Sequence, residues 1–228
     1  PSDLFTTPEK APAIKDNTTF YAVFAAATGA PTYKLTAADD MEAGVYAIGA
    51  IRSTSASNDY YFADGTVSDG DANVADVKVT ADEDGVIASL PTGTKEFTFA
   101  GDNTNGFTIS FVEGETTKYL GYTAASNRKL AFGDYSTTKW IVDAKENPLN
   151  EGGVTLYSPY GTDGKYRISE NSTGTSAIRG YSGGAAYRAI YLFKKDKGSY
   201  GDYAVTCGAS SGTVKLTSGC DKSTVTLA

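Results

Sequence analysis

Short runs of alternating apolar and polar residues recur along most of this chain, and each run predicts a β-strand. Clusters of Gly, Asp, Asn and Ser separate the runs and predict tight turns. Only residues 33–44 carry helical signals, with Thr36 or Asp39 as a candidate N-cap and Gly44 at the end, so we expect one short helical turn there. The predicted fold class is therefore all-β. The predicted strands are residues 45–51, 77–80, 96–100, 107–112, 139–144, 154–158, 190–195 and 213–217.

Comparison of the chain with itself reveals three segments of similar layout, the first of which carries an acidic insertion at 64–85. Three degenerate copies of about four strands each are typical of a β-trefoil-like three-repeat barrel, in which no copy can bury its apolar face alone. Chance alternation in a β-rich chain is the alternative. In order, the copies begin with GVYAI (44), GFTIS (106) and GVTLY (153), continue with YYFADG (60), KYLGYT (118) and KYRISE (165), and close with KEFTFAGDN (95), TKWIVDAKEN (138) and RAIYLFKKD (188).

Four stretches carry a resemblance to a known kind of module: YKLTAADDMEAGVYAIGA (33–50), KYLGY (118–122), KYRISEN (165–171) and IRGYS…IYLFKK (178–195). They resemble a module of large secreted and surface multidomain proteins of gut anaerobic bacteria, related in form to ricin-type β-trefoils. The resemblance covers about residues 30–197. It implies a secreted or cell-surface, non-catalytic binding module, with carbohydrate as the best-motivated ligand class.

The flanking sequences predict further β modules. The stretch APAIKDNTTFYAVFA (11–25) resembles the closing strand of an internalin-type B repeat. We therefore expect residues 1–29 to be the tail of a preceding β module or an added strand, and 30–197 to be the trefoil-like domain. Residues 198–228 are expected to be a small additional β segment that starts a further module. Because the chain opens at Pro1 without an initiator Met, a slice of a longer multidomain protein is expected.

Charge and hydropathy narrow the range of partners. The net charge is −7 and the nearest basic run, Lys194, Lys195 and Lys197, is short, so nucleic acid is not an expected partner. No apolar stretch of 18 residues occurs in the sequence, so no membrane insertion is expected. The two cysteines, Cys207 and Cys220, predict a disulfide in an oxidising compartment; two buried free thiols are the alternative.

The chain has no histidine, which removes the commonest general base and the main nitrogen ligand of zinc. Carboxylate-pair chemistry would still need two acids that converge in a cleft. Here the acids, such as those at 82–84, lie in turn sequences where they are expected to face water. No nucleophile elbow, phosphate loop or metal-ligand spacing is present in the sequence. We expect no catalysis and no cofactor; a hydrolase fragment that uses carboxylates is a third, less favoured alternative.

Ricin-type lectins carry a Gln-x-Trp signature in the last strand of each repeat, and this chain departs from it. The equivalent triplets are Lys95-Glu96-Phe97, Thr138-Lys139-Trp140 and Arg188-Ala189-Ile190. None contains Gln and only one contains Trp. The departure puts inherited ricin-type sugar specificity in doubt, and it favours Phe97, Trp140 and Ile190 as anchors of the core.

Two polar clusters remain as candidate ligand-binding residues, since sugar recognition combines an aromatic face with polar partners for the hydroxyl groups. Each lies in the loop region between the Tyr strand and the closing strand of its copy, and each could equally be a solvated turn. The candidates are Tyr122, Asn127, Asp134 and Tyr135 in the second copy, and Asn171, Arg179 and Tyr181 in the third.

The acidic loop of the first copy presents Asp69, Asp71 and Asn73 at the i, i+2, i+4 spacing of a calcium loop. Val74 occupies the position where such a loop needs Gly, and Thr80 the position of the bidentate Glu. A solvated hairpin is therefore favoured over a cation site.

Taken together, the sequence predicts an extracellular, non-catalytic binding module for a glycan or another host or cell-surface ligand. The alternative is a structural spacer or adhesin segment without a pocket.

Overall fold

The alternating apolar runs form antiparallel β-strands, as predicted from the sequence. The structure, a computed structural model, describes residues 31–53, 55–123, 129–158, 166–170, 177–181 and 188–196, and the backbone of three strands between 202 and 227. At residues 166, 177 and 181 only the backbone is described. The one helical element in these ranges is the three-residue 3-10 helix η2 (Ala38–Asp40), which is too short to cross a membrane.

The strands follow one another along the chain with short connections. In order they are β1 (Tyr33–Thr36), β2 (Gly44–Ala50), β3 (Asp59–Ser68), β4 (Asp71–Thr80), β5 (Val86–Ile87), β6 (Phe97–Asp102), β7 (Gly106–Glu113), β8 (Thr116–Tyr122), β9 (Leu130–Gly133), β10 (Ile141–Ala144), β11 (Val154–Ser158), β12 (Tyr166–Glu170), β13 (Ala177–Tyr181), β14 (Tyr191–Lys195), β15 (Asp202–Cys207), β16 (Ser210–Lys215) and β17 (Thr226–Leu227).

The short helical turn expected within 33–44 is confirmed, but its predicted cap is wrong. The residue before η2 is Ala37, and no side chain caps the turn. Thr36 instead ends strand β1, where its hydroxyl donates to the carbonyl of Lys34 at 3.1 Å. A residue whose backbone belongs to a strand is not placed to cap the following turn, so strand pairing overrode the capping preference.

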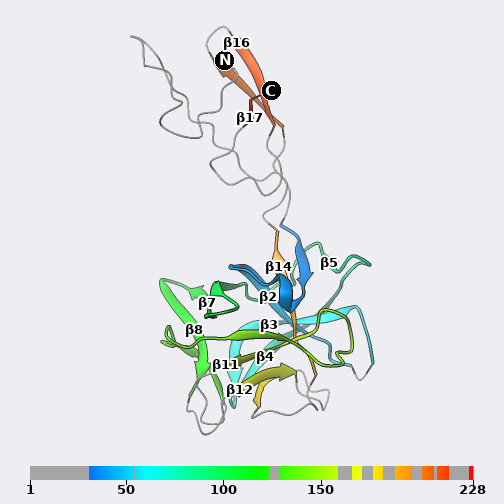
Figure 1. Ribbon diagram of the computed structural model, residues 1–228, viewed down its shortest axis with the longest axis vertical. Coiled ribbons are helices and arrows are strands. Elements are labelled where there is room, and N and C mark those ends of the chain that lie inside the picture. Colours follow the sequence, from blue (N-terminus) through cyan, green and yellow to red (C-terminus); the bar gives the residue numbers. More distant parts are fainter. Residues whose placement is uncertain are drawn as a thin grey trace. The chain divides into compact units, whose positions relative to one another are not determined.

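Strands β1 to β14 belong to one antiparallel sheet that curls into a half-barrel around its core (Figure 1). They lie within a compact unit of the chain, Thr32–Asp196. Strands β15, β16 and β17 form a separate antiparallel sheet that belongs to a second unit. The prediction of an all-β fold is therefore confirmed for the described residues.

One set of strand pairings occurs three times in the large sheet. Strand β2 pairs with β14 along one edge, and with β6 and then β3 along the other. Strand β7 pairs with β6 along one edge, and with Trp140 and then β8 along the other. Strand β11 pairs in the same order with β10, Ile190 and β12. Each of these three strands is hydrogen-bonded along both edges, so none leaves a long unpaired edge.

Apolar side chains from β2, β6, β8, β11 and β12 meet in the larger of two buried clusters, which is the main core of the sheet. Ile48, Phe97, Leu120, Leu156 and Ile168 come from five different strands and line the same small space at its centre. All five are buried. Alternation places these residues on the inner face of the sheet, whereas the opposite faces of β2 and β14 are also apolar and bury Ala47 and Phe193 in the second cluster.

The three predicted core anchors are confirmed. Phe97, Trp140 and Ile190 are each completely buried within this core. The indole Nε1 of Trp140 donates a hydrogen bond of 3.1 Å to the carbonyl oxygen of Leu120, which satisfies the one polar atom of the indole ring.

The acidic insertion of the first copy forms a hairpin, as favoured from the sequence. Strands β3 and β4 extend to a two-residue turn at Asp69–Gly70. Gly70 has φ +88°, and a Cβ atom there would lie 2.5 Å from the Cβ of Lys129. Only glycine allows this close approach, and the Gly70 carbonyl accepts a hydrogen bond of 2.8 Å from the amide of Leu130. The hairpin tip therefore docks against the start of β9.

We predict that Leu156→Ala lowers the free energy of unfolding by about 2–5 kcal/mol, because it leaves a cavity at the centre of the core. The measurement is urea unfolding followed by the fluorescence of Trp140, the only tryptophan in the chain. Val112→Ala is the matched control: Val112 is 65% exposed on β7, and its truncation should change stability by less than about 0.5 kcal/mol. Equal losses for the two variants would contradict the assignment of the core.

Candidate functional site

The second-copy candidates lie on and beside strands β8 and β9. The Tyr122 ring is partly buried against the core, with its centroid 5.3 Å from that of Trp140. Asp134 is exposed to solvent. Asn127 lies outside the described residues. Within this cluster, Tyr122 faces the core and Asp134 faces water.

Tyr135 packs over two glycines. A Cβ atom at Gly121 would lie 2.3 Å from the ring carbon Cγ of Tyr135, and one at Gly133 would lie 3.2 Å from the ring carbon Cε2. The ring thus occupies the space that side chains on β8 and β9 would otherwise fill. This position gives Tyr135 a packing role, because an aromatic ring over strand glycines restores the contacts that they lack.

Of the third-copy candidates, the structure describes the side chain of Arg179. Its Nε donates to both carboxylate oxygens of Asp71, at 2.9 and 3.0 Å. The terminal nitrogen Nη2 also donates to Oδ2 of Asp71, and this two-nitrogen fork is the strong form of an Arg–carboxylate interaction. Asn171 and the side chain of Tyr181 lie outside the described residues.

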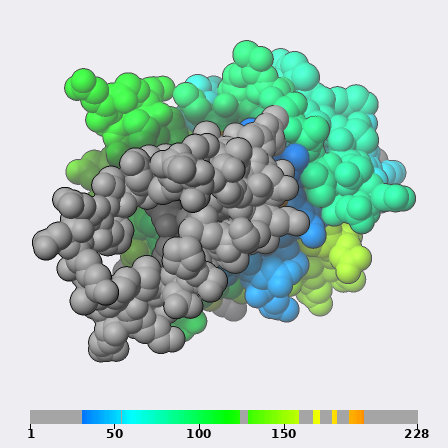
Figure 2. All heavy atoms as spheres, turned by 90° about the horizontal axis from the view of Figure 1, so that it is seen from above, coloured from blue at the N-terminus to red at the C-terminus, as the bar shows by residue number. Residues whose placement is uncertain are grey.

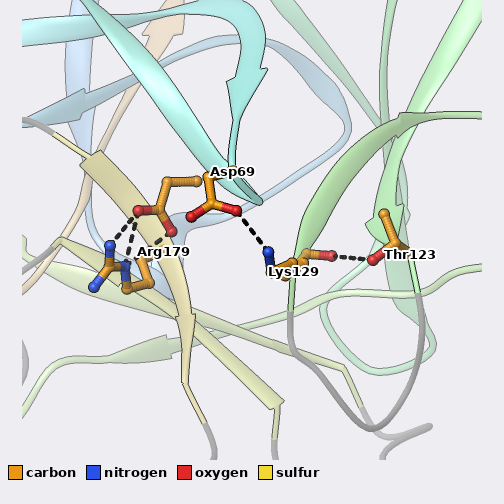
Figure 3. A network of polar contacts seen from close by, with 5 residues as sticks. Asp69, Thr123, Lys129 and Arg179 are labelled. Carbon is orange, nitrogen blue, oxygen red and sulfur yellow. Dashed lines mark hydrogen bonds and ion pairs between the residues drawn. The ribbon is translucent and has the colours of Figure 1, made fainter.

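Arg179 belongs to a polar network that joins the hairpins (Figure 3). Beside the Asp71–Arg179 pair, Asp69 accepts a bond of 2.6 Å from the ammonium of Lys129. The Lys129 carbonyl in turn accepts a bond of 2.9 Å from the amide of Thr123. The tip of the β3–β4 hairpin is therefore linked by its two aspartates to β13 and to the segment before β9.

The three residues with calcium-loop spacing, Asp69, Asp71 and Asn73, use their polar atoms in contacts with other side chains. Asp69 and Asp71 both face cationic side chains, and the amide of Asn73 donates to the hydroxyls of Thr66 and Ser68 at 2.8 and 2.9 Å. An amide that donates to two hydroxyls presents its NH₂ group, not its oxygen, to that side. No cluster of three or more metal-ligating side chains is found in the described part of the chain.

A pocket of about 480 Å³ opens on another part of the same unit, and no residue of either polar cluster lines it. In Figure 2 its lining segments lie close together at the right of the molecule: blue near 35–40, blue-green near 81–85 and yellow-green near 150–152. The lining comprises Leu35, Ala37, Asp40, Asn58, Tyr60, Ala81, Asp82, Glu83, Asp84, Gly85, Asn150, Glu151 and Gly152.

Asn150 holds one wall of the pocket in place. Its amide nitrogen donates to the carbonyl of Ser57 at 2.7 Å and to the hydroxyl of Tyr60 at 2.8 Å. Its backbone amide donates to the hydroxyl of Tyr191 at 3.1 Å. Burial raises the pKa of the Tyr60 hydroxyl, and raises that of Tyr191 to about 12, so both hydroxyls stay neutral. This wall is pre-formed, because each of its hydrogen bonds joins distant parts of the chain.

The opposite wall is an acidic turn after β4. One carboxylate oxygen of Asp82 accepts from the backbone amides of Asp84 and Val86, at 3.0 and 2.8 Å, and so fixes the turn. Glu83 and Asp84 project from this turn and are exposed. The expectation that these acids face water is met, but the sequence did not indicate that they line a pocket.

The signal that could have located this site is the extra length of the first copy. The pocket uses the turn at 81–85, for which the shorter second copy has no counterpart between β9 and β10. In repeat proteins, an insertion that is confined to one repeat commonly forms a loop on the binding face, and this insertion is also long and acidic.

A buried acid, Glu170, lies behind the Asn150 wall. Its side chain is completely buried and accepts a hydrogen bond of 3.0 Å from the backbone amide of Ile51. Its other oxygen lies 3.7 Å from the guanidinium of Arg188. Burial raises the pKa of Glu170 to about 7, against the opposing effects of the Ile51 amide and of the nearby arginines, Arg188 and Arg52.

We predict that Glu170 makes stability depend on pH near neutrality. Because its pKa is higher in the folded state than in the unfolded chain, the stabilisation is complete below about pH 4.5 and is lost as the pH rises through about 7. Relative to Glu170→Gln, the wild type should therefore lose about 1–3 kcal/mol of unfolding free energy between about pH 5 and pH 8. Urea unfolding at several pH values measures this difference. The chain has no histidine to mask the effect, and parallel pH profiles for the two proteins would contradict it.

Comparisons of the chain with protein-family models, with curated proteins and with solved structures find no match. The resemblance to ricin-type modules and to an internalin-type B repeat stays a prediction from the quoted sequence motifs. Function is therefore argued from the geometry of the pocket.

Proposed function

We propose that this chain is a non-catalytic carbohydrate-binding module and that the pocket beside Asn150 is its binding site. The observation that carries the proposal is the pocket itself. Its volume of about 480 Å³ lies within the range of small-molecule sites. Secretion or a cell-surface location belongs to the same proposal and is supported by the sequence resemblance.

The lining of the pocket combines the groups that sugars need. Asn58 and Asn150 carry side-chain amides, and the acidic turn offers carboxylate oxygens that accept hydrogen bonds from vicinal hydroxyls. Leu35, Ala37 and Gly152 contribute apolar surface against which the CH face of a sugar ring can pack. Polar side chains are the majority of the lining, which suits a ligand rich in hydroxyl groups.

We also propose that the half-barrel is a β-trefoil of three degenerate repeats. The support is the single set of pairings that recurs at β2, β7 and β11, each strand lying at the start of one of the three similar segments. In such a fold the loops at the ends of the barrel are available for recognition, and the pocket is formed by loops.

The competing proposal is a structural spacer without a ligand. It is favoured by the contacts of Tyr135 and Arg179, two residues of the polar clusters that serve packing and hairpin docking. A binding measurement separates the two proposals, because a spacer predicts no saturable ligand.

We predict a saturable hit on a glycan array, and a decrease of about tenfold in affinity for that glycan in Asn58→Ala. Asn58 is exposed, and its backbone carbonyl, which bonds to the Ala81 amide, is kept in the variant. Titration calorimetry with wild type and Asn58→Ala measures the change. Tyr135→Ala, in which the pocket is intact, should bind as wild type does.

Two outcomes would count against this assignment. Silence across the array would favour the spacer. A loss of affinity in Tyr135→Ala but not in Asn58→Ala would move the site to the second-copy loops. Circular dichroism of each variant confirms that a loss of binding is not a loss of fold.

A further inference from the structure

The charge of the pocket indicates which carbohydrates it takes; this inference rests on the proposed function. Five of the lining side chains are carboxylates: Asp40, Asp82, Glu83, Asp84 and Glu151. No lysine or arginine is among the lining residues. The five come from three separate segments of the chain, and three of them belong to the turn at 82–84.

These carboxylates form no ion pair with the lysines and arginines that the structure describes. Nine ion pairs join carboxylates to lysines or arginines in the described residues, and none includes a pocket carboxylate. Lys34, the neighbour of Leu35 in β1, points to the other face of its strand, because successive side chains of a strand alternate. The pocket thus presents a negative potential, which favours a cationic ligand and repels an anionic one.

The spacing of the carboxylates favours an organic cation over a metal ion. No three of them in the described residues are close enough together to hold a metal. The charge is instead spread over a pocket of saccharide size, with amides and apolar surface between the carboxylates. A ligand of this size with a few separated ammonium groups matches that distribution, since each ammonium donates three hydrogen bonds and a carboxylate only accepts them.

We infer that the pocket selects saccharides that carry free amino groups and rejects saccharides that carry carboxylate or sulfate groups. Acetylation of the amino group would remove the charge while keeping the ring, so the acetylated sugar should bind more weakly. An acidic sugar would place a like charge beside Glu83, Asp84 and Glu151 and should not bind.

The experiment compares three oligosaccharides of equal length by titration calorimetry: a glucosamine oligomer, its N-acetylated counterpart and an oligogalacturonate. At about pH 5, where the amino groups of the glucosamine oligomer are protonated, it should bind at least about tenfold more tightly than the N-acetylated one. Oligogalacturonate should show no binding. The preference should shrink when the salt concentration rises from about 20 mM to about 300 mM, because exposed charges are screened.

A double variant of the pocket and a control variant outside it test whether the preference for amino sugars arises in the pocket. Asp84→Asn combined with Glu151→Gln removes two charges without touching the bonds that fix the turn, and should reduce the preference several-fold. Glu115→Gln is the matched control: Glu115 is exposed in the turn between β7 and β8, outside the pocket, and its loss should leave the preference unchanged.

The outcomes separate the inference from the function on which it rests. Equal affinity for the two glucosamine-based oligomers, together with weaker binding in Asn58→Ala, would overturn the inference and keep the carbohydrate site. A preference that the pocket variant and Glu115→Gln reduce equally would also overturn it, because the net charge of the protein would then account for it. Binding of a lysine oligomer as tight as that of the glucosamine oligomer would overturn the assignment to saccharides. No binding of any saccharide here or on the array would overturn the proposed function itself.

Discussion

Hydrogen bonding along both edges of β2, β7 and β11 is the constraint on which the rest of the structure depends. Each of these strands has hydrogen-bonded neighbours on both edges, and one neighbour of each comes from a distant part of the chain: β14 for β2, Trp140 for β7 and Ile190 for β11. Because the described unit has no α-helix to cover a sheet face, the sheet must curl to bury its apolar side. The polar links between hairpins, Asp69–Lys129 and Asp71–Arg179, hold the tips of strands whose inner faces already meet in the core.

Most of the pocket lies in connections between the strands of this frame, while Leu35 of β1 and Tyr60 of β3 complete its lining. Its lining uses the turn that follows β4 and the loop that precedes β11, two connections that carry none of the recurring pairings. Asn150 joins the loop before β11 to Tyr60 and Tyr191, which are themselves packed against each other with ring centroids 5.2 Å apart. Loops held in this way by a rigid barrel can differ in sequence without loss of the fold, and they carry binding function in many proteins.

The sequence predicted what local patterns determine and missed what distant contacts determine. Alternation predicted several of the strands, such as those at 107–112 and 154–158, because period-two burial is a property of neighbouring residues. The departure from the Gln-x-Trp triplets predicted the buried anchors Phe97 and Trp140, and the departure from a calcium loop favoured the hairpin at 64–76. The sequence could not predict that Asp71 pairs with Arg179, 108 positions away, or that Asn150 bonds to Tyr60, 90 positions away. Such contacts follow from the closure of the sheet, and a polar residue in a loop looks the same in the sequence whether it lines a pocket or faces water.

The central claim, that three recurrences of one pairing set share one core, is tested most directly by native-state hydrogen exchange. The amides that join the recurrences include Phe107, which bonds to Trp140, Val154, which bonds to Ile190, and the amides along β2. If the three share one core, these amides exchange only through global unfolding and report one common opening free energy. A much lower opening free energy for the amides of one recurrence, with the other two still protected, would contradict the claim, because that part of the sheet would then unfold alone.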